Sequence, residues 1–183
     1  MPVVPNAAAL LSLRIWYCKF KSLAPIAAYA HLEHLTIAGF PDETLDVLAG
    51  LKRLRYLSLL HFPKVTDLAP LARLKELEQL SLACLPSWDA SRKRIEVLSL
   101  EPLAQLPVLK ALELFGVITR DRSLGALANN RTIKTARFSG YPKVEVSQFY
   151  KFTGARDEFL LAATAQKLRK LAKLVPMLQP KLA

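Results

Sequence analysis

Apolar residues recur along the chain in a short motif, L-x-x-L-x-L, at nearly regular intervals. The alternation of apolar and polar positions inside the motif predicts a short strand that buries one of its faces. Successive copies begin 22, 22, 23, 32 and 24 residues apart. These intervals exclude a heptad repeat and the helical repeats of about 33 residues or more. The five copies and a degenerate sixth are Leu10-Leu13-Ile15, Leu32-Leu35-Ile37, Leu54-Leu57-Leu59, Leu77-Leu80-Leu82, Leu109-Leu112-Leu114 and Ile133-Ala136-Phe138.

The intervals fall in the range of roughly 20–29 residues that is typical of leucine-rich repeats. Over about residues 10–141 the chain therefore resembles the leucine-rich-repeat superfamily, most closely the 22-residue class of internalin-type and phosphatase-regulator-type proteins. The resemblance implies an α/β fold, a right-handed solenoid with a parallel, concave β-sheet of about six strands. Short helices or 3-10 turns would cover its convex side. The repeats start near residues 10, 32, 54, 77, 109 and 133.

A second apolar stretch follows each predicted strand. The A-P-L step at 69–71 and the L-x-P-L step at 100–103 resemble the convex segment of the family, which is a 3-10 turn or a short helix. The segments 44–53 and 123–132 predict short helices in the same place. Thr44 or Asp42 and Ser123 are the candidate N-caps, because their side-chain oxygens can accept a free N–H of the first turn.

The family commonly has asparagine where the chain leaves the strand, and its amide bonds to neighbouring turns. This sequence lacks the asparagine ladder, and we expect a stacked apolar column in its place. Proline follows in four of the six repeats, where its fixed φ helps the chain to turn. The column holds Cys18, Phe40, Phe62, Leu85, Val117 and Tyr141, and the prolines are Pro41, Pro63, Pro86 and Pro142.

The two ends of a solenoid expose apolar residues that must be covered. We expect residues 1–154 to form the solenoid, with 1–9 as an N-terminal cap. Residues 155–183 would form an amphipathic, basic capping helix and tail within the same domain, the helix running over 155–175. Its apolar side would hold Leu160, Leu161, Leu168, Leu171, Ala172 and Val175, and its basic side Lys167, Arg169, Lys170 and Lys173.

Composition indicates a folded, single-domain protein. Of the 183 residues 36 are leucine, yet no apolar run approaches the roughly 18–20 residues of a membrane helix. No secretory signal is expected, because the first apolar stretch has no basic residue before it and is broken by Pro2 and Pro5. Two cysteines are too few for a disulfide scaffold, so a cytoplasmic location is expected. The net charge of +11 is compatible with a nucleic acid or an acidic protein as partner.

The positions between the inward leucines are expected to line the concave surface, which repeat proteins commonly use for binding. Aromatic and arginine side chains there are of the types that anchor protein interfaces. The alternative is an exposed sheet that is merely tolerated. The predicted partner-binding residues are Arg14, Trp16, Tyr17, His34, Thr36, Tyr56, Ser58, His61, Gln79, Ser81, Glu113, Phe115 and Arg137.

A row of charges precedes the strands, at Glu33, Arg55, Glu78, Lys110 and Lys134, and its first four members alternate in sign. Adjacent members would lie about 4.8 Å apart if the strands are in register. We interpret the row as a structural ladder that fixes this register. The ladder also neutralises part of the basic charge and so weakens the case for nucleic-acid binding.

The fourth repeat is 32 residues long, against 23 for the third, and its extra residues lie within 86–99. A long loop on a rigid scaffold is a common place for function, and the candidate residues are Trp88, Arg92, Lys93 and Arg94. The alternative is a surface excursion in which Trp88, Ile95 and Val97 fold back on the core.

Motifs for catalysis or cofactor binding are missing: there is no G-x-S-x-G, P-loop or G-x-G-x-x-G. We interpret His31 and His34 as surface histidines, and expect no metal site and no cofactor. Cys18 and Cys84 lie three repeats apart, about 14 Å by strand spacing, so both are expected to be free thiols, with Cys18 buried.

The sequence therefore predicts a non-enzymatic protein–protein interaction module. A monomeric adaptor, regulator or neutraliser would hold another protein, of acidic character, on its concave surface. The alternative is nucleic-acid or anionic-surface binding through the repeat-four insert and the basic C-terminal helix.

Overall fold

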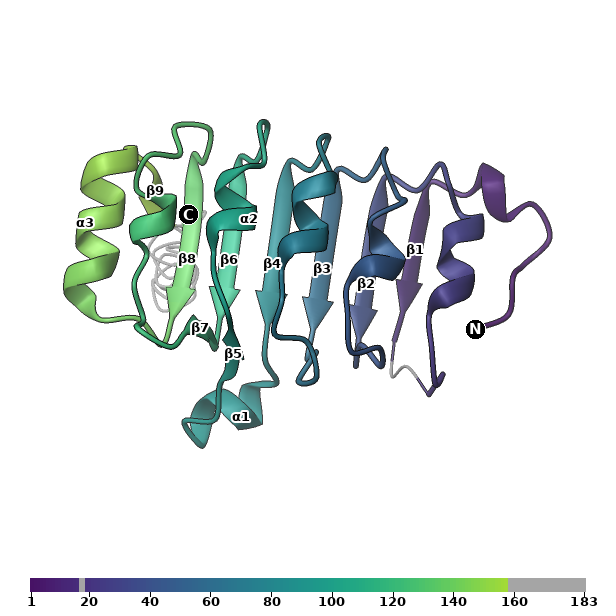
Figure 1. The fold of residues 1–183 in the computed structure, drawn as a ribbon, viewed down its shortest axis with the longest axis horizontal. Coiled ribbons are helices and arrows are strands. Elements are labelled where there is room, and N and C mark those ends of the chain that lie inside the picture. Colours follow the sequence, from purple (N-terminus) through teal and green to yellow (C-terminus); the bar gives the residue numbers. More distant parts are fainter. Residues whose placement is uncertain (17–18, 158–183) are drawn as a thin grey trace, which may run out of the picture.

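The computed structural model describes residues 1–16 and 19–157. Within that range the main element is a seven-stranded sheet in the order β1-β2-β3-β4-β6-β8-β9, whose strands all run in parallel (Figure 1). Six strands lie in the six predicted repeats, and the seventh extends the sheet at its C-terminal end. The strands are β1 (Ser12–Ile15), β2 (His34–Ala38), β3 (Tyr56–Leu60), β4 (Gln79–Ala83), β6 (Ala111–Phe115), β8 (Thr135–Ser139) and β9 (Arg156–Asp157).

The strands pair so that the leucines of the motif form columns across the sheet. Leu35, Leu57, Leu80 and Leu112 are successive partners, each at most 2% exposed, and Ala136 continues their column in β8. The column two residues later is buried in the same way. Each buried leucine contributes about 1.5–3 kcal/mol, and a lone repeat would leave these side chains exposed. The shared core therefore holds the repeats together.

Short 3-10 and α-helical segments cover one face of the sheet, which is the near face in Figure 1. Their positions confirm the predicted second half of each repeat. Proline is the second residue in three of them, where its missing N–H costs no intrahelical bond. They are η2 (Ala24–Ala28), η3 (Asp46–Leu48), η4 (Ala69–Arg73), α2 (Glu101–Ala104) and η5 (Gly125–Leu127).

A hydroxyl or carboxylate opens four of these segments by accepting the N–H two residues later. The acceptor precedes a leucine that is at most 2% exposed, so the capped turn and the core position are fixed together. A pattern [S/T/D]-L-x is thus a second signature of the repeat. The acceptors are Ser22, Asp67, Ser99 and Ser123, and Thr44 holds the same place in the second repeat.

The structure corrects one predicted cap. Ser123 accepts the N–H of Gly125 as expected, at 3.0 Å. Asp42, however, does not cap the segment of its own repeat: one carboxylate oxygen accepts the Ser22 hydroxyl at 2.6 Å and the other accepts the Leu23 N–H at 2.9 Å. The preceding repeat lies closer to this carboxylate, so Asp42 joins two repeats instead of capping one.

The predicted apolar column at the strand exits is confirmed for four members, but not in the fourth repeat, where Cys84 is buried in the core instead of Leu85. Phe40, Phe62 and Val117 are at most 2% exposed, and Leu85 and Tyr141 are half-buried. Burial raises the pKa of the Tyr141 hydroxyl. Cys18, the first predicted member, lies outside the described residues.

The residue just before this column adopts the left-handed conformation in four repeats, with φ between 64° and 93°. Three of the four are glycines, which take this conformation without strain. Where a side chain stands instead, the backbone carries a cost. The four are Gly39, His61, Gly116 and Gly140.

The repeat-four insert folds back on the core. It forms helix α1 (Pro86–Ala90) and strand β5 (Ile95–Val97), which pairs in parallel with β7 (Val117–Thr119) in a second, two-stranded sheet. Ile95 and Val97 are at most 3% exposed, and Trp88 packs partly buried against the core. The structural alternative for these three side chains is therefore confirmed.

The described C-terminal end is closed by helix α3 (Lys143–Thr153), which the sequence analysis missed. Phe149 is 2% exposed and meets Phe138 edge to face, with ring centroids 4.9 Å apart. The Tyr150 hydroxyl donates to the Ala136 carbonyl at 3.1 Å. Gly154, at φ 71°, ends the helix and sends the chain back to the sheet.

The C-terminal helix was predicted to begin at residue 155, and this start is wrong. Arg156 and Asp157 form β9, paired with β8, because Ala155 turns into the core at 8% exposed. The remainder of the predicted helix, with its apolar and basic sides, lies outside the described residues. At the other end, η1 (Ala7–Ala9) lies at the first repeat, and the buried Tyr29 hydroxyl accepts the Val4 N–H at 3.3 Å. In the ranges described, no helix has the length and apolar character needed to cross a bilayer.

Candidate protein-binding surface

The side chains between the buried leucines line the face of the sheet that the 3-10 segments leave uncovered, which we call the open face. His34, Tyr56, Gln79, Ala111 and Thr135 form its first column across five strands. The sequence therefore placed the strand residues correctly, and their role in binding stays a prediction. Ten predicted residues lie on this face: Arg14, His34, Thr36, Tyr56, Ser58, Gln79, Ser81, Glu113, Phe115 and Arg137.

The middle of the open face is hollowed beside an aromatic side chain. Tyr56 is half-buried and its ring lies 6.2 Å from that of His34. A hollow of about 160 Å³ lies between Tyr56, Ser81 and Glu113, because the small Ala111 fills little space there. A second hollow, of about 260 Å³, is lined by His34, Tyr56 and the charged residues before β3 and β4.

A fixed polar group crosses the next three strands. Glu113 accepts the Ser81 hydroxyl at 2.6 Å on one oxygen and an Arg137 N–H at 2.9 Å on the other. The Arg137 guanidinium also lies over the Phe115 ring, 5.0 Å from its centroid. These bonds hold the arginine and the aromatic ring in place before any partner arrives, which lowers the entropy cost of binding.

A third hollow, of about 260 Å³, closes the open face at its C-terminal end. Phe115 and Arg137 line it together with Phe138, Ser139 and Tyr150. The sequence pattern places Ser139 on this face but did not indicate Phe138 or Tyr150. Phe138 was assigned to the inward column, and Tyr150 comes from a helix that the pattern did not reveal.

The charge row before the strands forms the predicted ladder in its central part. Arg55 pairs with one Glu78 oxygen, and Lys110 pairs with the other at 2.6 Å. The hydrogen bonds from Lys110 and Arg55 lower the pKa of Glu78. The same hydrogen bond between Arg55 and Glu78 raises the pKa of Arg55. Lys134 follows Lys110 on the next strand, so two like charges adjoin there.

His61 lies at the exit of β3, where it meets Trp88 of the insert, instead of on the open face. His61 is the left-handed residue after β3, and its ring meets Trp88 edge to face at 4.6 Å. Its Nδ1 is buried without a hydrogen bond from the described part of the chain, and burial lowers its pKa. Trp16, 60% exposed, follows β1. Tyr17 lies outside the described residues.

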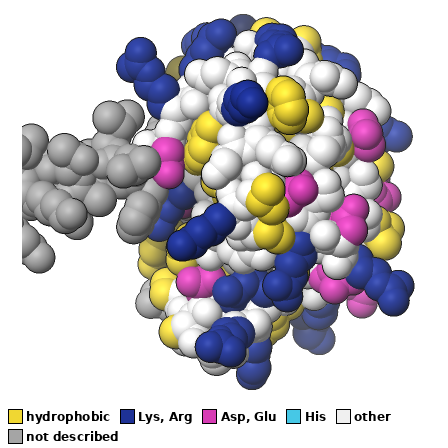
Figure 2. Space-filling model, turned by 90° about the vertical axis from the view of Figure 1, so that its left-hand side faces the viewer, with side chains coloured by type: hydrophobic (Ala, Val, Ile, Leu, Met, Phe, Trp, Pro, Cys, Tyr) yellow, Lys and Arg dark blue, Asp and Glu magenta, His cyan; other side chains and the backbone are white. Residues whose placement is uncertain are grey.

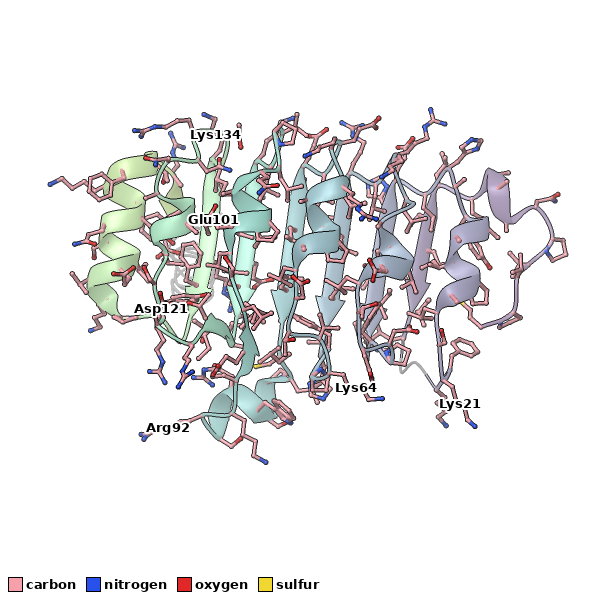
Figure 3. All side chains as sticks on the ribbon, viewed as in Figure 1. Lys21, Lys64, Arg92, Glu101, Asp121 and Lys134 are labelled. Carbon is pink, nitrogen blue, oxygen red and sulfur yellow. The ribbon has the colours of Figure 1, made fainter. Side chains whose placement is uncertain are left out.

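The basic triplet of the insert does not act as one group. Arg94 forms an ion pair with Asp89 at 3.1 Å, and Asp89 also accepts the Ser139 hydroxyl at 2.9 Å. Arg94 therefore helps to attach the insert to β8. Arg92 and Lys93 remain exposed, and Figure 3 shows Arg92 at the far end of the insert, away from the sheet.

Outside the open face, the described residues give less support for a ligand or metal site. A shallow groove of about 540 Å³ lies on the covered side, beside the 74%-exposed Leu98 and Arg120. Within residues 1–16 and 19–157, no three His, Cys, Asp or Glu side chains come close enough to hold a metal ion. Both His31 and His34 are exposed. Cys84 is a buried free thiol whose pKa is raised by burial.

Comparison with known proteins leads to the same architecture. No protein-family model matches the sequence, and no curated protein matches it. Among solved structures, the chain is similar to internalin C2 of Listeria monocytogenes, with 23% identity over 73% of this chain and 56% of that one, at a TM-score of 0.51. It is also similar to the internalin inlF of that organism, with 18% identity over 82% of this chain and 60% of that one, at a TM-score of 0.39.

The chain thus spans 56% and 60% of the lengths of these two neighbours. The likeness to internalin C2 concerns the fold, and it agrees with the repeated strands and the buried leucine columns described above. The strand order, the 3-10 segments on one face and this likeness lead to one conclusion: the chain folds as a leucine-rich-repeat solenoid, as its repeats predicted.

Proposed function

We propose that this protein is a non-enzymatic protein-binding module that holds its partner on the open face of the sheet. The observation that carries the proposal is the set of side chains kept in place on that face. Tyr56 borders two hollows, Phe115 and Arg137 border a third, and Glu113 holds Arg137 over the Phe115 ring. Tyrosine and arginine beside hollows are the residue types that dominate binding energy at protein interfaces.

Folding of the sheet does not require aromatic or charged side chains at these positions. The columns of leucine beneath them already fix the register and provide the core. A sheet that was only tolerated would be satisfied by small polar residues at every position, as at Ser58. Phe115 instead keeps part of its ring in solvent under a charged guanidinium.

The test compares two pairs of substitutions in affinity capture from the cells that produce the protein. Tyr56→Ala with Phe115→Ala changes the open face, and Leu98→Ala with Val144→Ala removes exposed apolar side chains elsewhere. We expect a partner that the wild type and the second variant capture and the first does not. The purified partner should then bind the first variant at least about tenfold more weakly. Equal binding to both variants would refute the proposal.

Nucleic-acid binding through the insert is the weaker candidate. Arg94 is held by Asp89, so the insert presents only two of its three cations, Arg92 and Lys93. Such binding would appear as affinity for generic RNA or DNA that falls steeply with salt. Replacing Arg92 and Lys93 with glutamine would then reduce that affinity.

A further inference from the structure

The turns that lead into the strands form a continuous edge along the solenoid, at the top of Figure 1, which we call the strand-start rim. It consists of residues 31–33, 52–55, 73–78, 105–110, 129–134 and 154–156, and the last of these, Arg156, is also the first residue of β9. Nine of its residues are Lys or Arg, and all nine are exposed. Its three carboxylates, Glu33, Glu76 and Glu78, all belong to the part before β4. The rim is therefore mixed in charge over its first half and purely basic over its second.

The change occurs at Lys110. On its β4 side Lys110 pairs with Glu78, which also serves Arg55. On its other side comes Lys134, whose N–H donates to the Lys110 carbonyl at 2.7 Å, and the Arg156 N–H then donates to the Lys134 carbonyl at 2.8 Å. Lys110 and Lys134 are thus neighbours just before β6 and β8, and Arg156, the partner of Thr135, adds a cation at the start of β9. Arg131 adds a fourth cation one turn away.

Among the described residues, these four cations receive little compensation. Lys110 shares Glu78 with Arg55, and the ammonium of Lys134 donates to the Arg131 carbonyl at 3.2 Å. An Arg131 N–H donates to the Phe152 carbonyl. Adjacent strands lie about 4.8 Å apart, and like charges directly opposite each other destabilise a sheet. The alternation that supports the first strands is absent here, although a single glutamate at position 134 would continue it.

The exposed surface agrees with this arrangement. Figure 2 shows Lys and Arg side chains along the upper edge of the C-terminal end, and Figure 3 labels Lys134 at that edge. The cluster adjoins the open face, because Ala111 and Thr135 directly follow Lys110 and Lys134 and belong to its first column.

We propose that Lys110, Arg131, Lys134 and Arg156 bind a cluster of carboxylates on the protein that occupies the open face. This inference rests on the proposed function and adds the chemistry of the partner and its orientation. The acidic cluster of the partner lies over the last three strands, because the first half of the rim sets three carboxylates against its five cations and therefore attracts it less.

The size of the cluster favours an acidic protein surface over a nucleic acid. Three strands at about 4.8 Å spacing give a purely basic zone only about 10 Å wide, which has room for two or three carboxylates. A nucleic acid following the rim would next meet Glu78, Glu76 and Glu33. The sequence of the rim has no Phe, Trp or Tyr on which bases would stack.

The test uses two variants that change the net charge equally. Lys134→Glu reverses a charge in the cluster, and Lys52→Glu is its control in the first half of the rim. The two lysines are matched because each is exposed and each donates to one backbone carbonyl, at 3.2 Å and 3.5 Å. The probes are a fluorescent ten-residue glutamate peptide and a single-stranded DNA of similar charge, followed by anisotropy.

We expect Lys134→Glu to weaken peptide binding about tenfold at low salt and Lys52→Glu less than about twofold, with the difference shrinking as salt rises. Lys134→Glu should also raise Tm by about 1–3 °C, because it restores the alternation beside Lys110. A gain in stability with a loss of binding separates a binding role from a structural one.

Equal weakening by the two variants would overturn the inference, because net charge alone would then explain binding. Tighter binding of the DNA, lost in Lys134→Glu, would overturn it in favour of a nucleic acid. If Lys134→Glu leaves both the peptide and the captured partner bound while the Tyr56 and Phe115 substitutions release the partner, only this inference fails. If the peptide needs Lys134 but those substitutions release nothing, the proposed function fails.

Discussion

The first four strands of the sheet and the last three are built on the same repeat but are stabilised differently. From β1 to β4 the strands follow at intervals of 22 or 23 residues, with Asp42 linking two repeats and Glu78 serving the cations on either side of it. Between β4 and β6 an insert supplies β5, which forms a second sheet with β7, and after β8 an aromatic helix closes the end. The first half is thus stabilised by contacts that recur from repeat to repeat, and the second half also by contacts that occur at one place only.

The largest effect is expected from the aromatic closure of the second half. Phe149→Ala should cost about 3–5 kcal/mol, because it removes a 2%-exposed ring from its contact with Phe138. Since repeats interact mainly with their neighbours, hydrogen exchange should accelerate in β8 and β9 more than in β2 and β3. Leu57→Ala in β3 is the matched core substitution, and its loss of protection should centre on the first half. A uniform loss in both variants would contradict the comparison.

The next effect concerns a close approach beside the insert. Gly116 has φ 64°, and a Cβ there would collide with the Cys84 sulfur. Gly116→Ala should therefore cost about 1–3 kcal/mol of unfolding free energy, measured by denaturant titration. Adding Cys84→Ala should recover the part due to the collision but not the part due to the backbone. Gly50→Ala, where a Cβ meets nothing within 4 Å, should be nearly neutral. No recovery in the double variant would mean that the thiol is not the obstacle.

The two halves also differ in how far their sequence predicts their structure. The leucine columns and the 3-10 segments were predictable because each repeat states the same pattern again. Helix α3 was missed because Val144 and Val146 alternate with polar residues as in a strand, although Pro142 and Gly154 mark its two ends.

On the open face, periodicity identified which side chains point outward but not which of them are fixed. The bond from Ser81 to Glu113 joins residues 32 positions apart, and only the fold brings them together. His61 was placed beside this face, yet its left-handed backbone turns it toward Trp88. Glycines at the equivalent position of other repeats, Gly39 and Gly116, hinted at the turn.

A smaller effect tests a feature that the halves share. Glu145 accepts the Ser123 hydroxyl at 3.1 Å and the Leu124 N–H at 2.8 Å. Near the other end of the solenoid, Asp42 accepts the same two groups from Ser22 and Leu23. Asp42→Ala and Glu145→Ala should each cost about 1 kcal/mol, because each leaves a backbone N–H without its acceptor. Similar losses of stability in thermal unfolding would show that these hydrogen bonds contribute equally in both halves. A loss in only one variant would restrict the device to that half.

The smallest effect is a dependence on pH that belongs to the first half. His61 carries a side chain where the other left-handed positions have glycine, and burial lowers its pKa below the ordinary 6.5. The fold therefore favours the neutral ring. Below about pH 6.5 the unfolded chain binds the proton more readily, so stability falls as the pH drops through that value and levels off below the folded pKa.

His61→Asn should remove this slope, since asparagine tolerates a left-handed backbone and does not titrate. The measurement is the difference in Tm between about pH 8 and about pH 5.5, which should be smaller in the variant than in the wild type. Trp88→Ala should shrink the same difference without removing the histidine, because it exposes the ring to water and returns its pKa toward the ordinary value. An unchanged slope in His61→Asn would place the acid sensitivity in the carboxylates, Glu78 first, whose lowered pKa also makes stability fall with pH, but at more acidic values.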